Sequence, residues 1–309
     1  MWGLYMNSIN QSQHLAFYID RLRQMRNMST EDFLDGIVSS RQYRRYISGD
    51  STMSYLVLDD LSKRLGFTAE SVLMELETEK IKQSQTIMAF YNAVLQKNQK
   101  EADLMLLEID ESELILETDL LLYKHGKLVY QHHFKHLKEE LLIEETKKLL
   151  KYDELLKRQA LSQSELHILI TLFNYPSFKE PEAIAKKLAS YLDDRLLIVT
   201  GHNIKIVTLV LEELSRYYSI VENYEKMLYY ADEALKYCLK IKSYYLLETI
   251  YYFKAAAHHE LGMFEERDLA LKRLYGLLVS ENNQAKLDRY KGLFMKRFNK
   301  EVKDLFTDL

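Results

Sequence analysis

The sequence contains few residues that would interrupt a helix: two prolines and nine glycines among 309 residues. Pro176 and Pro181 lie close together, so long stretches elsewhere contain no proline that would end a helix. Leu, Lys, Glu and Tyr dominate the composition, which favours an all-α protein. A chain of this length predicts one or two domains.

Cysteine and long apolar runs are also scarce. The single cysteine, Cys238, excludes an intramolecular disulfide framework, and we expect it to be a small buried side chain in a reducing compartment. No apolar run reaches the roughly 18 residues that a membrane span needs. The first residues lack the basic segment and apolar core of a signal peptide. We therefore expect a cytoplasmic protein without a membrane partner.

Positive charge is concentrated in one short segment, although the net charge of the chain is −4. Asp35–Gly49 reads DGIVSSRQYRRYISG, with three arginines and no acid between Ser39 and Gly49. Short helices are expected around it: one from about residue 13 to Met28, one capped by Ser29, one over 55–65 and one after Thr68. A short basic helix in such a series is typical of a helix that enters the DNA major groove.

The motifs LRQMRNMS (22–29), DGIVS (35–39), the run 43–49 and LDDLSKRLGF (58–67) resemble the Cro/repressor-like helix-turn-helix of bacterial regulators. The order and spacing of these four elements are most similar to the Rgg/PlcR peptide-responsive regulators, and the remainder of the chain is similar in architecture. There are departures: Thr30 replaces the usual Gln, Leu34 replaces a small Ala, and Ile47-Ser48 replaces the common Glu-Arg pair.

The resemblance implies that the helix beginning at Ser39 or Ser40 contacts an operator in double-stranded DNA. Arginine can bridge guanine O6 and N7, glutamine can pair with adenine, and a serine hydroxyl can bind a phosphate. The alternative is that the arginines merely solvate an exposed helix. The predicted DNA-binding residues are Ser40, Arg41, Gln42, Tyr43, Arg44 and Arg45.

The rest of the chain reads as paired helices. Residues 70–100 contain no Gly or Pro, which favours one long connecting helix. Aligning NYEKMLYYADEALKY (223–237) with MFEERDLALKRLYG (263–276) gives an offset of 40 residues, and an aromatic-rich helix precedes each, over 207–220 and 246–261. We predict a TPR-like α-solenoid of about five repeats. Its pairs begin near Ile81/Glu101, Glu113/Gly126, Glu144/Leu161, Glu182/Asn203 and Tyr224/Tyr244, and 287–309 forms a terminal cap.

This architecture predicts a helix-turn-helix domain over 1–70 and a peptide-sensing, dimerising domain over 71–309. Solenoids expose a concave groove, and tyrosine suits an extended peptide, although most of the 23 tyrosines could simply pack helices together. In the family that the sequence resembles, asparagine side chains often bind the backbone of a short signalling peptide. The candidate peptide-binding residues are Asn174, Asn203, Lys205, Glu212, Glu248, Tyr251 and Tyr252.

Catalytic and metal-binding patterns are absent from the sequence. His132 and His136 have the i, i+4 spacing of a metal site but no third ligand, and there is no HExxH, CxxC, Gly-rich phosphate loop or GxSxG elbow. We therefore expect no enzyme activity, cofactor or metal. The resemblance to the Rgg/PlcR regulators implies a homodimeric quorum-sensing transcriptional regulator. The alternative is a protein-interaction scaffold or antagonist with a helix-turn-helix remnant that no longer binds DNA, which Thr30 and Leu34 favour.

Overall fold

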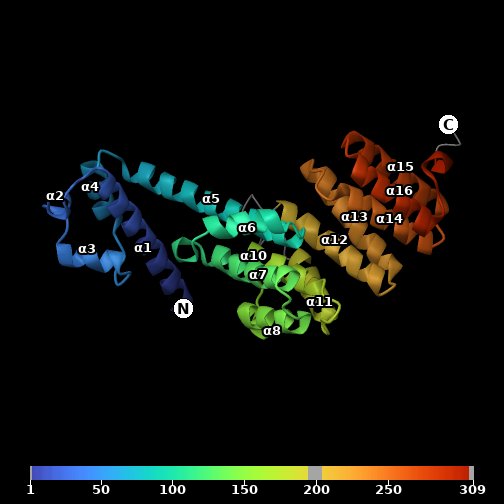
Figure 1. Ribbon diagram of the computed structural model, residues 1–309, viewed down its shortest axis with the longest axis horizontal. Coiled ribbons are helices and arrows are strands. Elements are labelled where there is room, and N and C mark those ends of the chain that lie inside the picture. The colour runs from blue at the N-terminus through green and yellow to red at the C-terminus, as the bar shows by residue number, and fades with distance from the viewer. Residues whose placement is uncertain (1, 194–203, 306–309) are drawn as a thin grey trace. The chain divides into compact units, whose positions relative to one another are not determined.

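The computed structural model describes residues 2–193 and 204–305, and these residues are helical without any strand (Figure 1). The all-α prediction is therefore confirmed. The chain divides into two compact units, residues 1–138 and 139–309. Within the described ranges, no helix is both long and apolar enough to cross a membrane.

The first unit begins with a helix-turn-helix bundle and continues into longer helices. Its helices are α1 (Trp2–Met25), α2 (Thr30–Leu34), α3 (Ser40–Ile47), α4 (Tyr55–Arg64), α5 (Ala69–Leu95), α6 (Gln99–Glu108), the 3-10 helix η1 (Glu111–Glu113) and α7 (Glu117–Phe134). α1 begins at Trp2, well before the predicted start near residue 13. The single helix α5 confirms the predicted long connecting helix.

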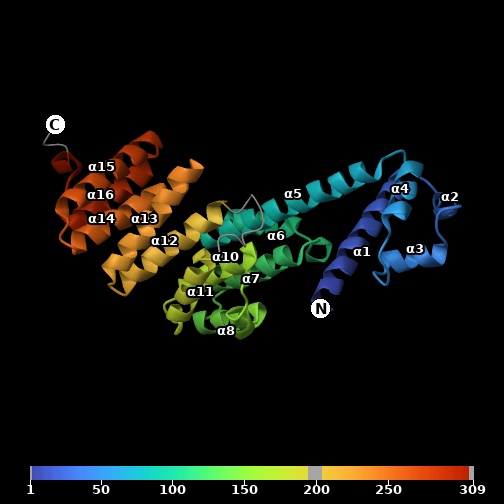
Figure 2. The same ribbon diagram turned by 180° about the vertical axis from the view of Figure 1, so that it is seen from behind.

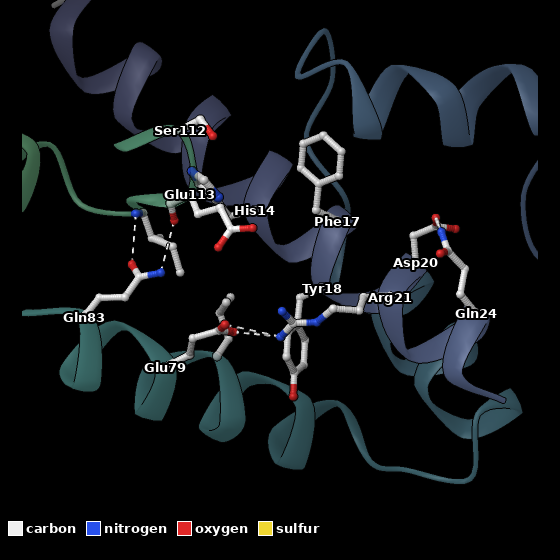
Figure 3. Close-up of a pocket in the computed structure, with 12 residues that line it drawn as sticks. His14, Phe17, Tyr18, Asp20, Arg21, Gln24, Glu79, Gln83, Ser112 and Glu113 are labelled. Carbon is white, nitrogen blue, oxygen red and sulfur yellow. Dashed lines mark hydrogen bonds and ion pairs between the residues drawn. The ribbon is translucent and has the colours of Figure 1, made fainter. Parts of the chain in front are cut away.

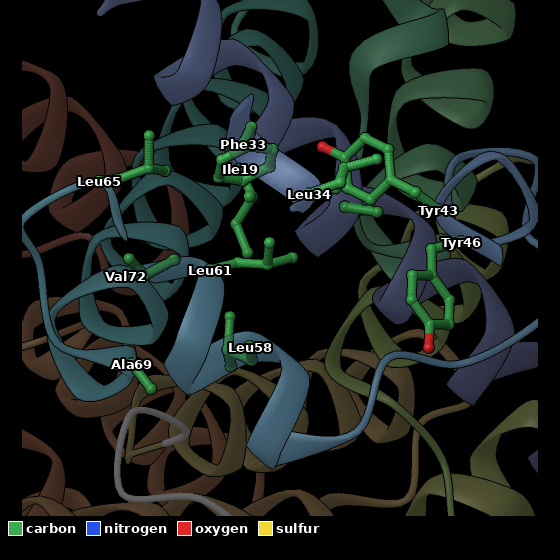
Figure 4. Close-up of a cluster of buried hydrophobic side chains, with 11 residues drawn as sticks. Ile19, Phe33, Leu34, Tyr43, Tyr46, Leu58, Leu61, Leu65, Ala69 and Val72 are labelled. Atoms are coloured by element: carbon green, nitrogen blue, oxygen red, sulfur yellow. The ribbon is translucent and has the colours of Figure 1, made fainter. Parts of the chain in front are cut away.

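Serine and threonine side chains fix the start of each short helix. Ser29, Ser39, Ser54 and Thr68 accept hydrogen bonds from backbone N–H groups at the starts of α2, α3, α4 and α5. The apolar faces of α1–α5 then meet in one core around Ile19, Phe33, Leu61 and Leu65, each fully buried (Figure 4). Leu34 belongs to this core at 3 % exposure, so the family's small residue is not needed for these helices to pack.

The prediction that a helix begins near Gly126 is wrong, because Gly126 lies in the middle of α7. A Cβ atom at this position would lie 2.7 Å from Cε1 of Phe90 and 3.3 Å from Cδ2 of Tyr91, both on α5. The glycine therefore permits close packing of α7 against α5 and does not mark a turn.

The second unit is built from consecutive helix pairs. Its helices are α8 (Glu139–Leu150), α9 (Tyr152–Leu155), α10 (Gln163–Phe173), α11 (Pro181–Asp193), α12 (Ile204–Ile220), α13 (Tyr224–Ile241), α14 (Leu247–Glu260), α15 (Phe264–Ser280), α16 (Gln284–Phe298) and the 3-10 helix η3 (Val302–Leu305). Successive helices from α12 to α15 lie side by side in both views (Figure 2). The predicted repeat is confirmed, since α13 begins at Tyr224 and α15 at Phe264.

A three-residue connection recurs between the helices of these pairs. Its middle residue has a left-handed backbone in each case: Glu222 (φ 56°) before α13, Gly262 (φ 75°) before α15 and Asn282 (φ 52°) before α16. Asn223 and Asn283 then accept a hydrogen bond from the third backbone N–H of the following helix. The same local geometry thus reverses the chain at these three connections, whereas α13 and α14 are joined by five residues.

The functional boundary predicted after residue 70 lies in the first turn of α5, which continues without a break to Leu95. The two compact units instead meet between residues 138 and 139. The division into a DNA-binding and a sensing domain therefore stays a prediction.

Candidate functional site

Two tyrosines anchor α3 to the core of the bundle. Tyr43 and Tyr46 are 4 % and 6 % exposed, and the ring of Tyr43 packs edge-on against Phe33 with centroids 5.8 Å apart. The Tyr43 hydroxyl donates a hydrogen bond to Oδ1 of Asp20 on α1, at 3.1 Å. Tyr43 was predicted to contact DNA, but it is a core residue. The i, i+3 spacing of the two tyrosines is the sequence signal for this buried face.

Other residues of α1 hold the Asp20 carboxylate that accepts the hydrogen bond from the Tyr43 hydroxyl. It accepts hydrogen bonds from Nε of Arg23 at 2.8 Å and from the amide of Gln24 at 2.7 Å. Burial alone would raise the pKa of Asp20, but the hydrogen bonds from Arg23, Gln24 and Tyr43 outweigh burial and lower it. The Tyr43 hydroxyl of α3 therefore donates to an ionised acceptor at neutral pH.

The other side of α3 carries the remaining predicted DNA-binding residues. The side chains of Ser40, Arg41, Arg44 and Arg45 are exposed, and that of Gln42 is half-buried. Nε of Arg44 donates to the carbonyl of Ser40 at 3.3 Å, a contact within one turn of the same helix. α3 itself contains no acid. A rigid helix with three arginines on its solvent side can approach phosphates and base edges without rearranging the backbone.

Two neighbouring arginines have structural roles that the sequence did not reveal. Nη1 of Arg64 donates to the carbonyls of Asp32 at 3.0 Å and Phe33 at 3.2 Å, where α2 ends. Nη1 of Arg23 donates to the carbonyl of Met28 at 2.6 Å. These side chains therefore close the connections around α2.

A cavity of about 450 Å³ lies between α1, α5 and the segment around η1 (Figure 3). Nη2 of Arg21 on α1 pairs with Glu79 on α5 at 3.1 Å. On the opposite wall, the amide of Gln83 donates to the carbonyl of Glu113 at 3.1 Å and accepts from the backbone N–H of Ile115 at 3.1 Å. α1 thus contacts α3 through Asp20 and α5 through Arg21.

The predicted peptide-binding residues in the second unit fall into two groups, and Asn203 lies outside the described residues. Asn174 follows α10 and its amide donates to Glu213 of α12 at 3.4 Å. Glu248 of α14 pairs with Nζ of Lys286 of α16 at 2.7 Å. Asn174 and Glu248 thus link successive first helices of the pairs, whereas Lys205 of α12 lies over the ring of Tyr245.

Tyr251 and Tyr252 do not join this group. Tyr251 is 8 % exposed, within the core. The ring of Tyr252 packs at 6.0 Å against both Tyr290 and Phe298, which belong to α16. Both tyrosines therefore hold helices together, which was the alternative that their abundance left open.

Glu212 and Glu213 form a buried acidic pair near the middle of α12, each 7 % exposed. Glu213 accepts a hydrogen bond from Nε of Arg216 at 2.7 Å, and the guanidinium also contacts it through Nη2. Burial raises the pKa of Glu212 to about 8, with smaller contributions from the charge of Glu213 and, in the opposite direction, Arg216. Prediction from sequence missed Glu213 and Arg216, although an acidic pair followed by an arginine at i+3 is visible there.

The histidine cluster on α7 makes backbone contacts. Nδ1 of His132 lies 2.7 Å from the carbonyl of Leu137, and Nδ1 of His133 lies 3.0 Å from the carbonyl of Val94. His136 has a left-handed backbone beyond the end of the helix. Across residues 2–193 and 204–305, no three His, Cys, Asp or Glu side chains converge as metal ligands.

Comparison with known proteins identifies the fold. The sequence matches no protein-family model and no curated protein. The structure is similar to that of ComR from S. thermophilus, which was solved in complex with DNA and its signalling peptide ComS. The TM-score is 0.54 and the sequences are 16 % identical; the alignment covers 92 % of this chain and 99 % of ComR.

Two further solved structures are similar over most of the chain. The apo form of the competence regulator ComR from Streptococcus vestibularis has a TM-score of 0.50 and 17 % identity, covering 93 % of this chain and 99 % of that one. The SHP pheromone receptor Rgg2 from Streptococcus dysgalactiae has a TM-score of 0.50 and 13 % identity, covering 91 % and 99 %. The chain has the fold of these peptide-responsive regulators, with a helix-turn-helix followed by TPR-like helix pairs.

Proposed function

We propose that this chain is a DNA-binding transcriptional regulator, controlled by a short signalling peptide that binds along α10, α12 and α14. The observation that carries the proposal is the arrangement of α3, which buries two tyrosines and presents Arg41, Arg44 and Arg45 to solvent. The likeness in fold to a regulator solved with DNA and its signalling peptide supports it.

The arginines of α3 have the chemistry for both kinds of DNA contact. A guanidinium that reaches O6 and N7 of guanine specifies a base, whereas one that reaches a phosphate fixes the register of the protein on the duplex. Because the hydrogen bond from Tyr43 to Asp20 and the burial of both tyrosines already hold α3 on α1, DNA binding does not carry the cost of ordering this helix.

We further propose that two copies act together as a homodimer. In a dimer, two α3 helices separated by about 34 Å would contact successive major grooves on one side of an imperfect palindrome. A peptide that binds one arrangement of the helix pairs more tightly than another would change the separation of the two α3 helices, and thereby the affinity for DNA.

Selection of duplexes from a random-sequence pool by the full chain tests the proposal. The expected product is a palindromic motif whose half-sites have centres about 10 base pairs apart. Addition of a signalling peptide should change the affinity for that motif. A pool that shows no enriched motif, with or without peptides, would instead support the scaffold function, in which the helix-turn-helix contributes only a fold.

A further inference from the structure

One face of α12 carries side chains that differ in burial. Lys205, Leu209, Glu212 and Arg216 follow one another at helical spacing and therefore share this face, which we call the stripe. Lys205 is exposed, Leu209 and Arg216 are partly buried, and Glu212 is 7 % exposed. Glu212 is thus the most buried residue of the stripe, and the other residues of the stripe are partly or fully exposed.

The charged groups around Glu212 already have partners of their own. Glu213 is paired with Arg216 on the same helix. Glu248 on α14 is paired with Lys286, which is also 2.8 Å from Glu281.

Lys205 is the remaining base on the stripe. Its ammonium lies over the ring of Tyr245, 5.6 Å from the centroid. Among the described residues, no hydrogen bond or ion pair is formed by Glu212. This carboxyl therefore has three acidic or aromatic neighbours and no counter-charge of its own.

A buried carboxyl without a partner favours a cation that arrives from outside. The arrangement does not suit a metal ion, because no three potential ligands converge in the described ranges. An organic cation needs only one carboxylate and apolar or aromatic walls, which Leu209 and Tyr245 supply beside Glu212.

We propose that Glu212 binds a positively charged group of the peptide ligand, either a Lys or Arg side chain or the terminal ammonium. This inference rests on the proposed peptide-sensing function and names the chemistry of the ligand. The cation pairs with the carboxylate of Glu212, which lies on the stripe between Lys205 and Arg216.

The pairing couples binding to proton release. In the free chain Glu212 is mostly protonated at neutral pH, because burial raises its pKa to about 8. A cation that binds the ionised form must displace this proton, so affinity increases with pH. If the pKa falls below 6 in the complex, linkage gives an increase of about 50-fold from pH 6 to pH 8. The groups around Glu212 are Glu213 and Arg216 on α12, Glu248 on α14, and Tyr245 with Lys205 over its ring. Burial also raises the pKa of Glu213, although its hydrogen bonds from Arg216 and Asn174 oppose this.

Affinity-selection mass spectrometry on the full chain provides the ligand for the test. The probes are four sets of synthetic octapeptide pools. Each set places one residue type, Lys, Arg, norleucine or Glu, at every position in turn, and each pool is made with a free and with an acetylated N-terminus. Peptides retained by the wild type are then measured individually by fluorescence anisotropy at pH 6, 7 and 8. We expect Lys- or Arg-containing peptides, or peptides with a free N-terminus, to be retained preferentially, and the acetylated pools distinguish these two sources of charge.

The decisive comparison uses Glu212→Gln with Glu225→Gln as control, since Glu225 is exposed on α13. Glu212→Gln should weaken binding of the cationic peptide at least tenfold at pH 8, remove the pH dependence and leave binding of its uncharged analogue unchanged. Glu225→Gln should behave as the wild type. If Glu212→Gln fails to fold, two measurements on the wild type still test the proposal: the pH dependence of peptide binding, and the comparison of the cationic peptide with its uncharged norleucine analogue.

Two results would overturn the inference and can be told apart. An analogue that carries neither charge, with norleucine in place of Lys or Arg and an acetylated N-terminus, that binds as tightly as the cationic peptide with no effect of pH removes the role of Glu212 and leaves peptide sensing intact. Retention of no peptide from any pool overturns both this inference and the peptide-sensing part of the proposed function.

Discussion

Substitution of Gly126 by Ala tests the packing of α7 on α5. In a helix interior, Ala is more favourable than Gly by about 1 kcal/mol, so an unopposed substitution would stabilise the protein. At Gly126, however, the new methyl group would lie 2.7 Å from Phe90 and 3.3 Å from Tyr91. Both rings are fully buried, and the Tyr91 hydroxyl lies 2.8 Å from Nδ1 of His125, so neither ring can withdraw into solvent.

Overpacking of this kind costs about 1–3 kcal/mol, which exceeds the gain in helix propensity. We expect Gly126→Ala to lower the free energy of unfolding by about 1 kcal/mol, as the difference between these two effects. Gly276→Ala in α15 is the matched control, because no heavy atom lies within 4 Å of its Cβ position. That variant should gain about 1 kcal/mol. Urea unfolding followed by far-UV circular dichroism measures both, and a Gly126→Ala protein as stable as the control would refute the reasoning.

Three further predictions concern the turns, the core and acid stability. Gly262→Ala should destabilise the protein by about 1 kcal/mol in urea unfolding, since its φ of 75° disfavours a side chain although space is open; unchanged stability would contradict this. Tyr43→Phe removes the hydrogen bond to Asp20, so it should lower the free energy of unfolding by about 1–2 kcal/mol at pH 7 and leave the affinity for DNA unchanged. A large loss of DNA affinity in the folded variant would instead show that Tyr43 contacts DNA. Burial lowers the pKa of His125 to about 3, below its unfolded value of about 6.5, so the neutral side chain costs no stability well above pH 6.5 and the protein loses stability as the pH falls through that value. Between pH 8 and pH 5 the wild type should lose about 2 kcal/mol more than His125→Gln, and equal losses would exclude His125 as the cause.

Features determined by neighbours in sequence were predictable. The caps at Ser29 and Ser39 each accept a hydrogen bond from the backbone N–H three residues further on, so the starts of α2 and α3 could be predicted from the sequence. The repeat that relates Tyr224 to Phe264 was equally visible, because each begins a second helix after the same three-residue connection.

Features determined by contacts between distant residues were not predictable. Gly126 resembled a helix breaker because its partners, Phe90 and Tyr91, belong to another helix. Tyr43 lies between basic residues in the sequence, and only the position of Asp20 on α1 shows that its hydroxyl faces inward. The sequence made Glu212 a candidate peptide-binding residue by its type alone. That Glu212 has no oppositely charged partner could not be predicted, because this depends on which partner each surrounding charged group has in the structure.

The central claim is that the arginines of α3 bind DNA, and fluorescence anisotropy on the selected duplex tests it most directly. The variants are Arg44→Ala/Arg45→Ala and, as a control that removes two positive charges elsewhere, Lys240→Ala/Lys296→Ala, whose side chains are exposed on α13 and α16. Two lost contacts of about 1–3 kcal/mol each predict that the arginine variant binds at least thirtyfold more weakly, with a shallower salt dependence, while the control binds as the wild type. Equal affinity of the wild type and both variants, or equal binding to the selected and a scrambled duplex, would contradict the claim.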